Sequence, residues 1–546
     1  MRQLLALTVG IIDVPPQHLI SQLSHVGRVQ ADQCRNLTIG SGGHFITTAG
    51  GAAPTPLLQS SEDPYLDGMH ILYSLPRSSL LTEDEIRKGV VGYFINSPQF
   101  QKHLSDENIQ AIPASFISAL FFLYHLHSAG TAHAEPLWQA WAAHNHATTR
   151  TATDALYRWT EEELDRLEEK RLADSARQLR SAADVQYDRL FLPLARAFPR
   201  FFNWGEIRRE DYLSAVGVAL CQSTPVDGIQ SDVLQPLPLR QYPSLETADG
   251  AASFGSALSN LWLEEVEQEL RMPDGSIRQR SMVNLVTRRA TPLEAGAELI
   301  LSGRRRNDDL LLHCGYLWDD LRSASVPLRM RMAYGASQVK GEAALRAALL
   351  AKFNLNETSD FVLTHGSIPP KLEVWSRIHL ALDEEIRAAM EQGGGRTAFE
   401  QPMSVQTKEQ VYHHLLRSLT SMRSEYEHDV AEDEMLLGEG SSKVARKARR
   451  DPGLLSVRAE LAVRHRRLSK LVLEDAIERV SNSLQSATRE REAEGVEPSP
   501  DSKSPPYSTA RERKRRDKEQ REKERKRESV RKRRAAVKVE EAKAEL

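Results

Sequence analysis

The chain has 546 residues, which at roughly 100–200 residues per domain corresponds to two or three domains. Hydrophobic residues make up 40% and charged residues 27% of the sequence, which excludes a wholly disordered or fibrous protein. The net charge of −3 hides an asymmetry: residues 511–534 contain 15 Lys/Arg and 6 Asp/Glu, a local net charge of +9, which leaves −12 for the remainder. Composition therefore predicts an acidic globular protein with a basic tail.

Residues 1–36 are interpreted as an N-terminal extension. The first 60 residues contain only two acidic side chains, those of Asp13 and Asp32. This acid-poor composition is compatible with a mitochondrial targeting segment. An ordinary extension is the alternative. We therefore expect a mitochondrial location, with the nucleus or cytoplasm as alternatives.

Short apolar runs at 44–48 and 70–75 predict strands, and Thr82 followed by Glu85 is typical of a helix start. Helical spacing then dominates from about 82 to 225. Strand-like runs return at 282–286 and 298–301. We predict a β-rich domain with a long helical insertion, an α+β organisation rather than an alternating βαβ chain.

Further along the chain, the apolar spacing predicts helices in the segments 327–352, 370–390, 406–434 and 453–485. A Pro/Ser-rich hinge precedes the basic tail, which is helical or disordered. The predicted fold class is α+β: a β-rich domain with a helical insertion, followed by an all-α C-terminal domain and the tail. The predicted domains are 1–36, 37–325 with the insertion at about 82–225, 326–490 and 491–546.

The three cysteines, Cys34, Cys221 and Cys314, are far apart and form no CxxC pair. This spacing predicts neither a disulfide framework nor a zinc site, and it favours a reducing compartment. No apolar run reaches the ~20 residues that a membrane-spanning helix requires, so no span is expected.

Several stretches resemble SET-domain proteins of the Rubisco large-subunit methyltransferase (LSMT) class, which carry a helical substrate-binding domain after the SET domain. The resemblance runs in order from about residue 40 to residue 485. The stretches that carry it are LYSLPRSSLLT (72–82), ALFFLY (119–124), LWQAW (137–141), WTEEEL (159–164), DYLSA (211–215), NDDLLLHCGY (307–316), YEHDVAEDE (426–434) and LSVRAELAVR (455–464).

The resemblance implies an S-adenosylmethionine pocket and a channel for a substrate lysine. It places Gly42, Gly43 and Asn307 as candidate cofactor-binding residues. The family's catalytic tyrosine, which orients and deprotonates the amine, would fall at Ser302. Tyr242 and Tyr316 are the candidate substitutes for the missing phenol.

The sequence departs from the family pattern at each of these positions. The family's Gly-x-Gly turn aligns with Ser41-Gly42-Gly43, in which one glycine keeps its position and the other is shifted by one. The family's Asn-His pair aligns with Tyr242-Pro243, and proline offers no N–H and no polar side chain. Cys314 replaces an aromatic residue. These departures predict a catalytically degenerate domain with no cofactor, and S-adenosylmethionine binding is the alternative.

Five histidines between 125 and 146 are interpreted as ordinary core or surface residues rather than a metal site. His125 and His127 lie two residues apart on a predicted helix, so their side chains diverge by about 200°. The residues are His125, His127, His133, His144 and His146.

Two basic segments are candidate nucleic-acid-binding sites, because lysine and arginine neutralise phosphates. The tail lacks aromatic residues for base stacking, so sequence readout is not expected. A solvated single helix and a nuclear-localisation signal remain alternatives for the tail. The candidate residues are Arg511, Arg513, Lys514, Arg515, Arg516, Arg525, Lys526, Arg527, Arg531, Lys532, Arg533 and Arg534 in the tail, and Lys443, Arg446, Lys447, Arg449 and Arg450 in a loop.

The sequence leads to three functional hypotheses. The first is a non-catalytic SET-domain scaffold that binds RNA or a large ribonucleoprotein, with the mitochondrial ribosome or its assembly machinery as the expected setting. The second is an active S-adenosylmethionine-dependent protein-lysine N-methyltransferase. Of the three hypotheses, only this one requires a protein substrate. The third is a protein that binds S-adenosylmethionine without transferring its methyl group.

Overall fold

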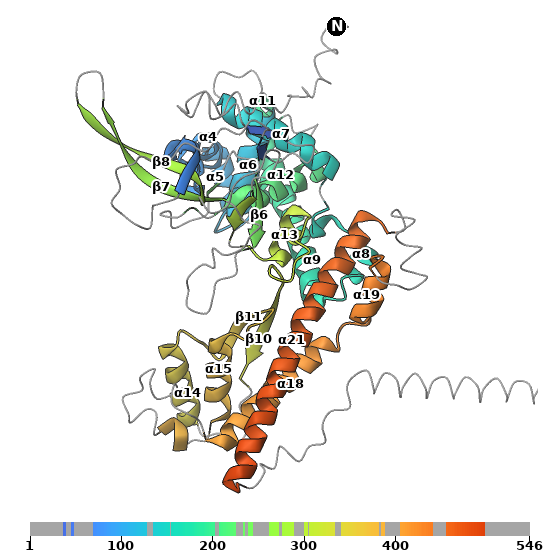
Figure 1. Ribbon diagram of the computed structural model, residues 1–546. Helices are drawn as coiled ribbons and strands as arrows, with labels where there is room; N and C mark the ends of the chain where they lie inside the picture. Colours follow the sequence, from blue (N-terminus) through green and yellow to red (C-terminus); the bar gives the residue numbers. More distant parts are fainter. Residues whose placement is uncertain are drawn as a thin grey trace, which may run out of the picture. The chain divides into compact units, whose positions relative to one another are not determined.

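The computed structural model divides into two compact units, residues 1–324 with 447–465 and residues 325–446 with 466–546 (Figure 1). The structure describes residues 37–39, 45–47, 69–127, 135–152, 154–202, 207–224, 226, 233–234, 239–243, 261–271, 276–288, 300–303, 305–332, 340–381, 384–387, 404–439 and 455–496.

The first unit contains short strands on both sides of a helical insertion. Its elements are β1 (Leu37–Ile39), β2 (Phe45–Thr47), β3 (Met69–Pro76), a 3₁₀ turn (Arg77–Ser79), α3 (Glu83–Lys88), α4 (Val90–Ile95), α5 (Pro98–Asp106), α6 (Ala114–His127), α7 (Pro136–Ala152), a 3₁₀ turn (Leu156–Arg158), α8 (Glu161–Asp165), α9 (Lys170–Gln186), a π turn (Tyr187–Phe191), α10 (Leu192–Ala197), α11 (Pro199–Phe202), α12 (Arg209–Gln222), β4 (Ser223–Thr224), β5 (Val233–Leu234), β6 (Arg240–Pro243), β7 (Leu261–Arg271), β8 (Ile277–Arg288), β9 (Ile300–Gly303) and α13 (Asn307–Cys314).

The principal sheet of this unit has the strand order β3-β8-β7-β9-β6. β8 pairs antiparallel with both β3 and β7, and β7 and β8 form a long hairpin (Figure 1). β9 pairs parallel with β6, which is the edge strand in this order. The predicted strands at 70–75 and 282–286 are confirmed, and the strand predicted at 298–301 overlaps β9.

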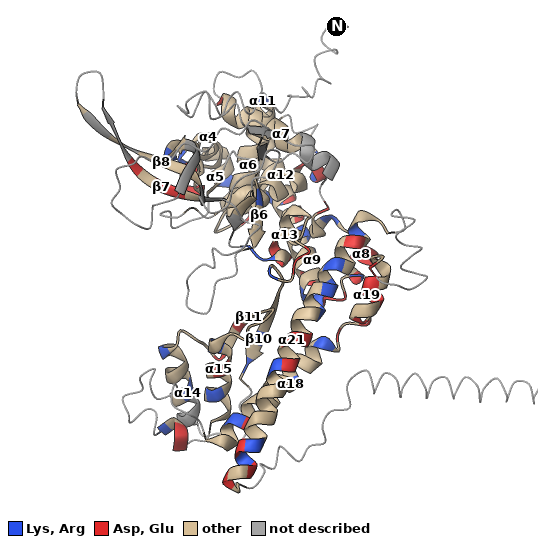
Figure 2. Ribbon diagram, in the orientation of Figure 1, with Lys and Arg blue, Asp and Glu red and all other residues tan. Residues whose placement is uncertain are grey.

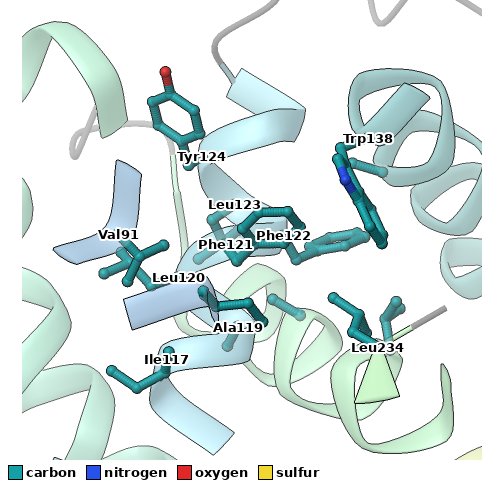
Figure 3. Packing of buried hydrophobic residues seen from close by; sticks show 14 of the residues in the cluster. Val91, Ile117, Ala119, Leu120, Phe121, Phe122, Leu123, Tyr124, Trp138 and Leu234 are labelled. Atoms are coloured by element: carbon teal, nitrogen blue, oxygen red, sulfur yellow. The ribbon is translucent and has the colours of Figure 1, made fainter. Parts of the chain in front are cut away.

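The helical insertion supplies the hydrophobic core of this unit. α6 is apolar around most of its circumference, which is typical of a helix buried on all sides. Figure 3 shows its side chains packed with Val91 of α4, Trp138 of α7 and Leu234 of β5. Leu120, Leu123 and the other core side chains of α6 are almost fully buried. α6 and α7 both lie within the segment of about 82–225 for which helical spacing was predicted.

Local capping explains where two of the helices begin. The Thr82 hydroxyl accepts a hydrogen bond from the Glu85 N–H, and the Glu85 carboxylate accepts one from the Thr82 N–H at 2.7 Å. Thr160 and Glu163 form the same reciprocal pair at the start of α8. Each pair satisfies backbone donors that a helix N-terminus leaves unpaired, and the helix start predicted at Thr82 is confirmed.

The second unit is mainly helical. Its elements are β10 (Ser325–Arg331), α14 (Lys340–Lys352), β11 (Thr358–Thr364), α15 (Pro370–Leu380), α18 (Val405–Arg423) and α19 (Val430–Leu436), together with the greater part of α21 (Val457–Glu494), whose first residues are grouped with the first unit.

The predicted helix over 327–352 is wrong in its first part. Residues 325–331 form β10, which pairs antiparallel with β11. Val326, Leu328 and Met330 are buried while Arg329 and Arg331 are exposed. From Leu328 to Arg331 burial alternates with a period of two residues, which is typical of a half-buried strand. Among the described residues of this range, those from 340 to 352 form the helix α14.

The fold class is confirmed as α+β with a predominantly helical C-terminal region. Within the described part of the chain, no helix is both long and apolar enough to cross a bilayer. Acidic and basic residues are interspersed along α21 (Figure 2).

Candidate functional site at β6 and α13

The backbone of β6 and β9 brings two of the predicted site positions together. Tyr242 is opposite Ser302, and Pro243 is opposite Gly303, in the parallel pairing. α13 then begins at Asn307. The sequence positions that the resemblance assigned to the catalytic phenol and to the cofactor are therefore neighbours in the first unit.

The Tyr242 side chain is held by internal contacts. Only 1% of it is exposed, and its hydroxyl donates a hydrogen bond to the Asp320 carboxylate at 2.9 Å. Its ring lies against that of Trp318, with the two ring centroids 5.3 Å apart. A buried phenol is ordinarily hydrogen-bonded in this way, and these contacts give Tyr242 a structural role.

Tyr316 and Trp318 hold the backbone of the edge strand. The Gln241 N–H donates to the Tyr316 hydroxyl at 2.9 Å, and the Trp318 indole N–H donates to the Gln241 carbonyl at 2.7 Å. An edge strand lacks a neighbouring strand on one side, so its backbone groups need other partners. The two aromatic side chains supply these partners for Gln241.

Arg240 lies between the same two aromatic rings. Its guanidinium carbon is 4.7 Å from the Tyr316 ring centroid and 4.4 Å from that of Trp318. A cation within about 6 Å of an aromatic face is attracted by the ring quadrupole. The Tyr316 and Trp318 rings therefore contact the Arg240 guanidinium, a cation within the same chain.

Asn307 fastens the segment after α13. Its amide nitrogen donates to the Trp318 carbonyl at 2.9 Å and to the Ser323 hydroxyl at 3.2 Å. Its amide oxygen accepts from the Trp318 N–H at 3.0 Å. The residue is 3% exposed, so both ends of the carboxamide are bound to the protein and screened from solvent.

Cys221 and Cys314 form a disulfide, which the cysteine spacing did not predict. The two residues are 93 positions apart in sequence, yet their Cα atoms are 5.1 Å apart. Cys221 is in the last turn of α12 and Cys314 is the last residue of α13. Sequence spacing contained no sign of the pair, because only the packing of these helices brings their ends together.

Arg305 and Gln241 bind the end of α12 at this point. Arg305 donates to the Ser223 carbonyl at 2.6 Å and to the Cys221 carbonyl at 3.4 Å. The Gln241 side chain donates to the same two carbonyls, each at 3.3 Å.

His313 of α13 is partly buried close to Arg305. Burial, aided by the Arg305 charge, lowers the pKa of His313 to about 4. His313 is thus neutral near pH 7.

Gly315 allows the chain to turn after α13. Its φ of +74° is in the left-handed region, which favours glycine at a helix end. A Cβ atom there would come within 2.4 Å of the Ala155 backbone nitrogen. The close approach positions Tyr316 for its contact with β6.

A buried acid–base cluster is present on the other side of α13. His465 Nε2 is 2.9 Å from Asp308 Oδ1, and His465 Nδ1 is 3.6 Å from Glu169. Burial alone lowers the pKa of His465, but the Asp308 hydrogen bond and the two carboxylate charges outweigh burial and raise it above 6.5. Because the imidazole is 3% exposed, this cluster is interpreted as structural.

The described side of the site is a poor fit to S-adenosylmethionine. Pro243 lacks an N–H, and the Asn307 carboxamide is bound at both ends. The Tyr242 and Tyr316 hydroxyls are bound to Asp320 and Gln241. The groups that the family resemblance assigned to the cofactor or the amine are thus either absent or bound within the fold, so we derive no reaction step through the cofactor.

Other predicted site residues lie outside the described residues. These are Gly42 and Gly43, the basic residues Lys443, Arg446, Lys447, Arg449 and Arg450, and the tail residues from Arg511 to Arg534. The roles assigned to them remain predictions.

The histidines give no sign of a metal centre in the described ranges. No group of three His, Cys, Asp or Glu there has the geometry to hold a metal ion. Burial lowers the pKa of His125 to about 3, and its ring lies against Phe121 with centroids 4.4 Å apart. His133 is outside the described residues.

Sequence reasoning missed Arg240, Gln241, Trp318 and Asp320. One signal was available: Tyr316 and Trp318 are two positions apart in the sequence, and in an extended segment such residues face the same side. A cavity of about 360 Å³ is lined by side chains of the second unit and none of the predicted site residues. The lining residues are His413, Leu484, Gln485, Thr488 and Arg489.

Comparison with known proteins supports the resemblance. Residues 340–473 match the family model described as Rubisco LSMT substrate-binding. A solved structure of the SET domain of LSMT bound to lysine and AdoHcy is 13% identical, with a TM-score of 0.58, and the match covers 87% of this chain and 92% of that one. Comparison with curated protein sequences found no match.

A structure of Rubisco LSMT bound to AdoMet is similar to the same extent. It is 14% identical with a TM-score of 0.54, and the match covers 89% of this chain and 97% of that one. At this identity the likeness establishes the fold and not the activity. The chain thus has the SET methyltransferase-like fold of LSMT type, with a segment at 340–473 that matches the Rubisco LSMT substrate-binding family.

Proposed function

We propose that this protein is a non-catalytic binding protein, in which an LSMT-type SET fold serves as a rigid scaffold and basic segments bind RNA or a ribonucleoprotein. The mitochondrial ribosome or its assembly machinery is the setting we favour, because of the acid-poor N-terminus and the basic tail.

The observation that carries the non-catalytic part is the use of the polar groups at β6 and α13. The Tyr242 and Tyr316 hydroxyls and the Asn307 carboxamide each have partners within the fold. Serine occupies the family's tyrosine position at Ser302, and serine is shorter and far less acidic than a phenol. To act on a cofactor or substrate, each of these groups would have to give up or share its present partner.

Charge supports the RNA-binding part. The segment 511–534 has a net charge of +9 and no aromatic residue, which favours contacts to phosphates over base stacking. If about half of the basic groups meet phosphates, affinity for RNA should fall by about 10³-fold or more between 50 and 200 mM salt.

Deletion of residues 509–546 tests this part. RNA affinity would be measured by fluorescence anisotropy for the full chain and the deletion variant, at several salt concentrations. We expect the deletion to remove most of the affinity and to flatten the salt dependence. Unchanged RNA binding at physiological salt would contradict the proposal.

An active protein-lysine methyltransferase is the second candidate. The likeness to LSMT structures favours it, and so does the position of Tyr242 beside Ser302 in the strand pairing. A third reading, S-adenosylmethionine binding without transfer, differs from it only in the chemical step. Calorimetry with S-adenosylmethionine followed by a transfer assay distinguishes all three.

A further inference from the structure

The Cys221–Cys314 disulfide is at the point where α12, β6 and α13 meet. Both cysteines are only partly buried. The Cys221 carbonyl accepts hydrogen bonds from the Gln241 and Arg305 side chains. Cys314 is followed directly by the turn at Gly315 and then by Tyr316, whose hydroxyl binds Gln241. The disulfide therefore joins two segments that both hold the edge strand.

We propose that Cys221 and Cys314 are a reversible dithiol–disulfide pair, and that their oxidation state controls how firmly the segment 314–318 holds β6. The proposal concerns a modification site and goes beyond the proposed function. It does not depend on whether the protein binds RNA or S-adenosylmethionine.

The chemistry requires a small-molecule disulfide as the oxidant, such as oxidised glutathione. One cysteine thiolate attacks this disulfide, forms a mixed disulfide and releases one glutathione thiolate. The second cysteine thiolate attacks the protein sulfur of the mixed disulfide and releases the second glutathione. Two electrons pass from the protein to glutathione, and the two thiol protons end on the two released glutathiones.

The native fold should favour the disulfide strongly. In the unfolded chain the two cysteines must be brought together across 93 positions, whereas the folded chain holds their Cα atoms 5.1 Å apart. Disulfides that close long loops typically stabilise the native state enough to make the oxidation equilibrium constant roughly 100-fold larger in native than in denatured protein.

The first experiment measures this equilibrium in a Cys34→Ser background, which leaves only the pair. The reduced full chain is equilibrated with reduced and oxidised glutathione, with and without urea, then alkylated and weighed by mass spectrometry. We expect an internal disulfide with little glutathione adduct, and a roughly 100-fold larger constant without urea. Two independent glutathione adducts in the native protein would overturn the proposal.

The second experiment tests control of the strand. Hydrogen exchange of a peptide that contains residues 239–243 is compared in the oxidised and the reduced Cys34→Ser protein. We expect exchange at least about tenfold faster after reduction, because Tyr316 and Trp318 hold the Gln241 backbone less firmly. Cys34→Ser/Cys314→Ser should behave like the reduced protein.

Equal exchange in the two redox states would overturn the control of β6 even if the disulfide forms. The redox comparison uses one polypeptide without substitution of the pair, so a folding defect of the double variant cannot obscure the result. A peptide from α6, which is remote in the sequence and lies in the hydrophobic core, serves as the internal control and should exchange equally in both states.

Discussion

The β6–α13 site in the first unit and the Asp433 cluster in the second both bury polar side chains, but they satisfy them differently. At the site, neutral phenols and an amide bind backbone and side-chain partners, and Arg240 lies between aromatic rings. In the second unit, the fully buried Asp433 pairs with Arg466 and Lys470. Neutral groups can lose a partner at modest cost, whereas a buried charge cannot.

This difference predicts the largest loss of stability for Asp433→Asn. The variant removes the carboxylate charge with which Arg466 and Lys470 pair, and removing one partner of a buried ion pair typically costs about 3–5 kcal/mol. Urea unfolding, with hydrogen exchange of α19 and α21 peptides to locate the effect, checks this. Asp360→Asn is the matched control, because Asp360 pairs with Arg329 at the surface. The Asp360 side chain is 58% exposed and the Arg329 side chain 65% exposed, so this pair should contribute at most about 1 kcal/mol. Similar losses in both variants would contradict the contrast.

Asn307→Ala should come next. It leaves the Trp318 N–H without its partner and removes one of the two hydrogen bonds to the Trp318 carbonyl, which also accepts from the Ser323 hydroxyl, at a cost of about 1–3 kcal/mol. Urea unfolding of the first unit measures the loss, and Asn96→Ala, at an exposed position, should stay within about 0.5 kcal/mol. An unaffected stability in Asn307→Ala would indicate that the amide is available for another partner.

Tyr242→Phe should have a smaller effect. It removes the hydrogen bond to Asp320 while keeping the contact with Trp318, so about 1 kcal/mol is expected. Because Asp320 is only partly buried, water can replace the hydroxyl. The variant should retain its near-UV circular dichroism. A wild-type methyl-transfer activity that this substitution abolishes would instead assign Tyr242 to catalysis.

The smallest effect concerns pH. The pKa of His465 is raised above 6.5 in the folded state, so its contribution to stability is complete below about pH 6.5 and lost as pH rises through the folded-state pKa. The pKa of His125 is lowered to about 3, so its contribution is complete above about pH 6.5 and lost as pH falls toward 3.

His465→Gln should therefore flatten the alkaline side of the stability profile, and His125→Phe should flatten the acidic side. Thermal unfolding between about pH 4 and pH 9 measures both, with each variant as the control for the other. A His465→Gln variant that keeps the wild-type alkaline slope would show that the imidazole is not charged when buried between Asp308 and Glu169.

Local signals in the sequence predicted much of the fold. The Thr82 cap and the apolar run of α6 depend on neighbours a few residues away, so they were visible. β10 was missed because a strand of seven residues precedes a longer helical pattern, which dominated the window.

The site was predicted only as a set of positions. The resemblance at 307–316 to the family pattern pointed to Ser302 and Asn307, but the partners of Asn307 and Tyr242 come from the segment 318–323. The disulfide and the contact of Arg240 with Trp318 depend on packing between segments distant in the chain. No local pattern encodes such contacts.

Calorimetric titration of the full chain with S-adenosylmethionine tests the central claim most directly. If the polar groups of β6 and α13 are committed to the fold, no binding heat should appear at micromolar cofactor, and no methyl group should reach a protein acceptor. Micromolar binding together with methyl transfer would contradict the account, because it would show that the fold retains a working cofactor and catalytic site.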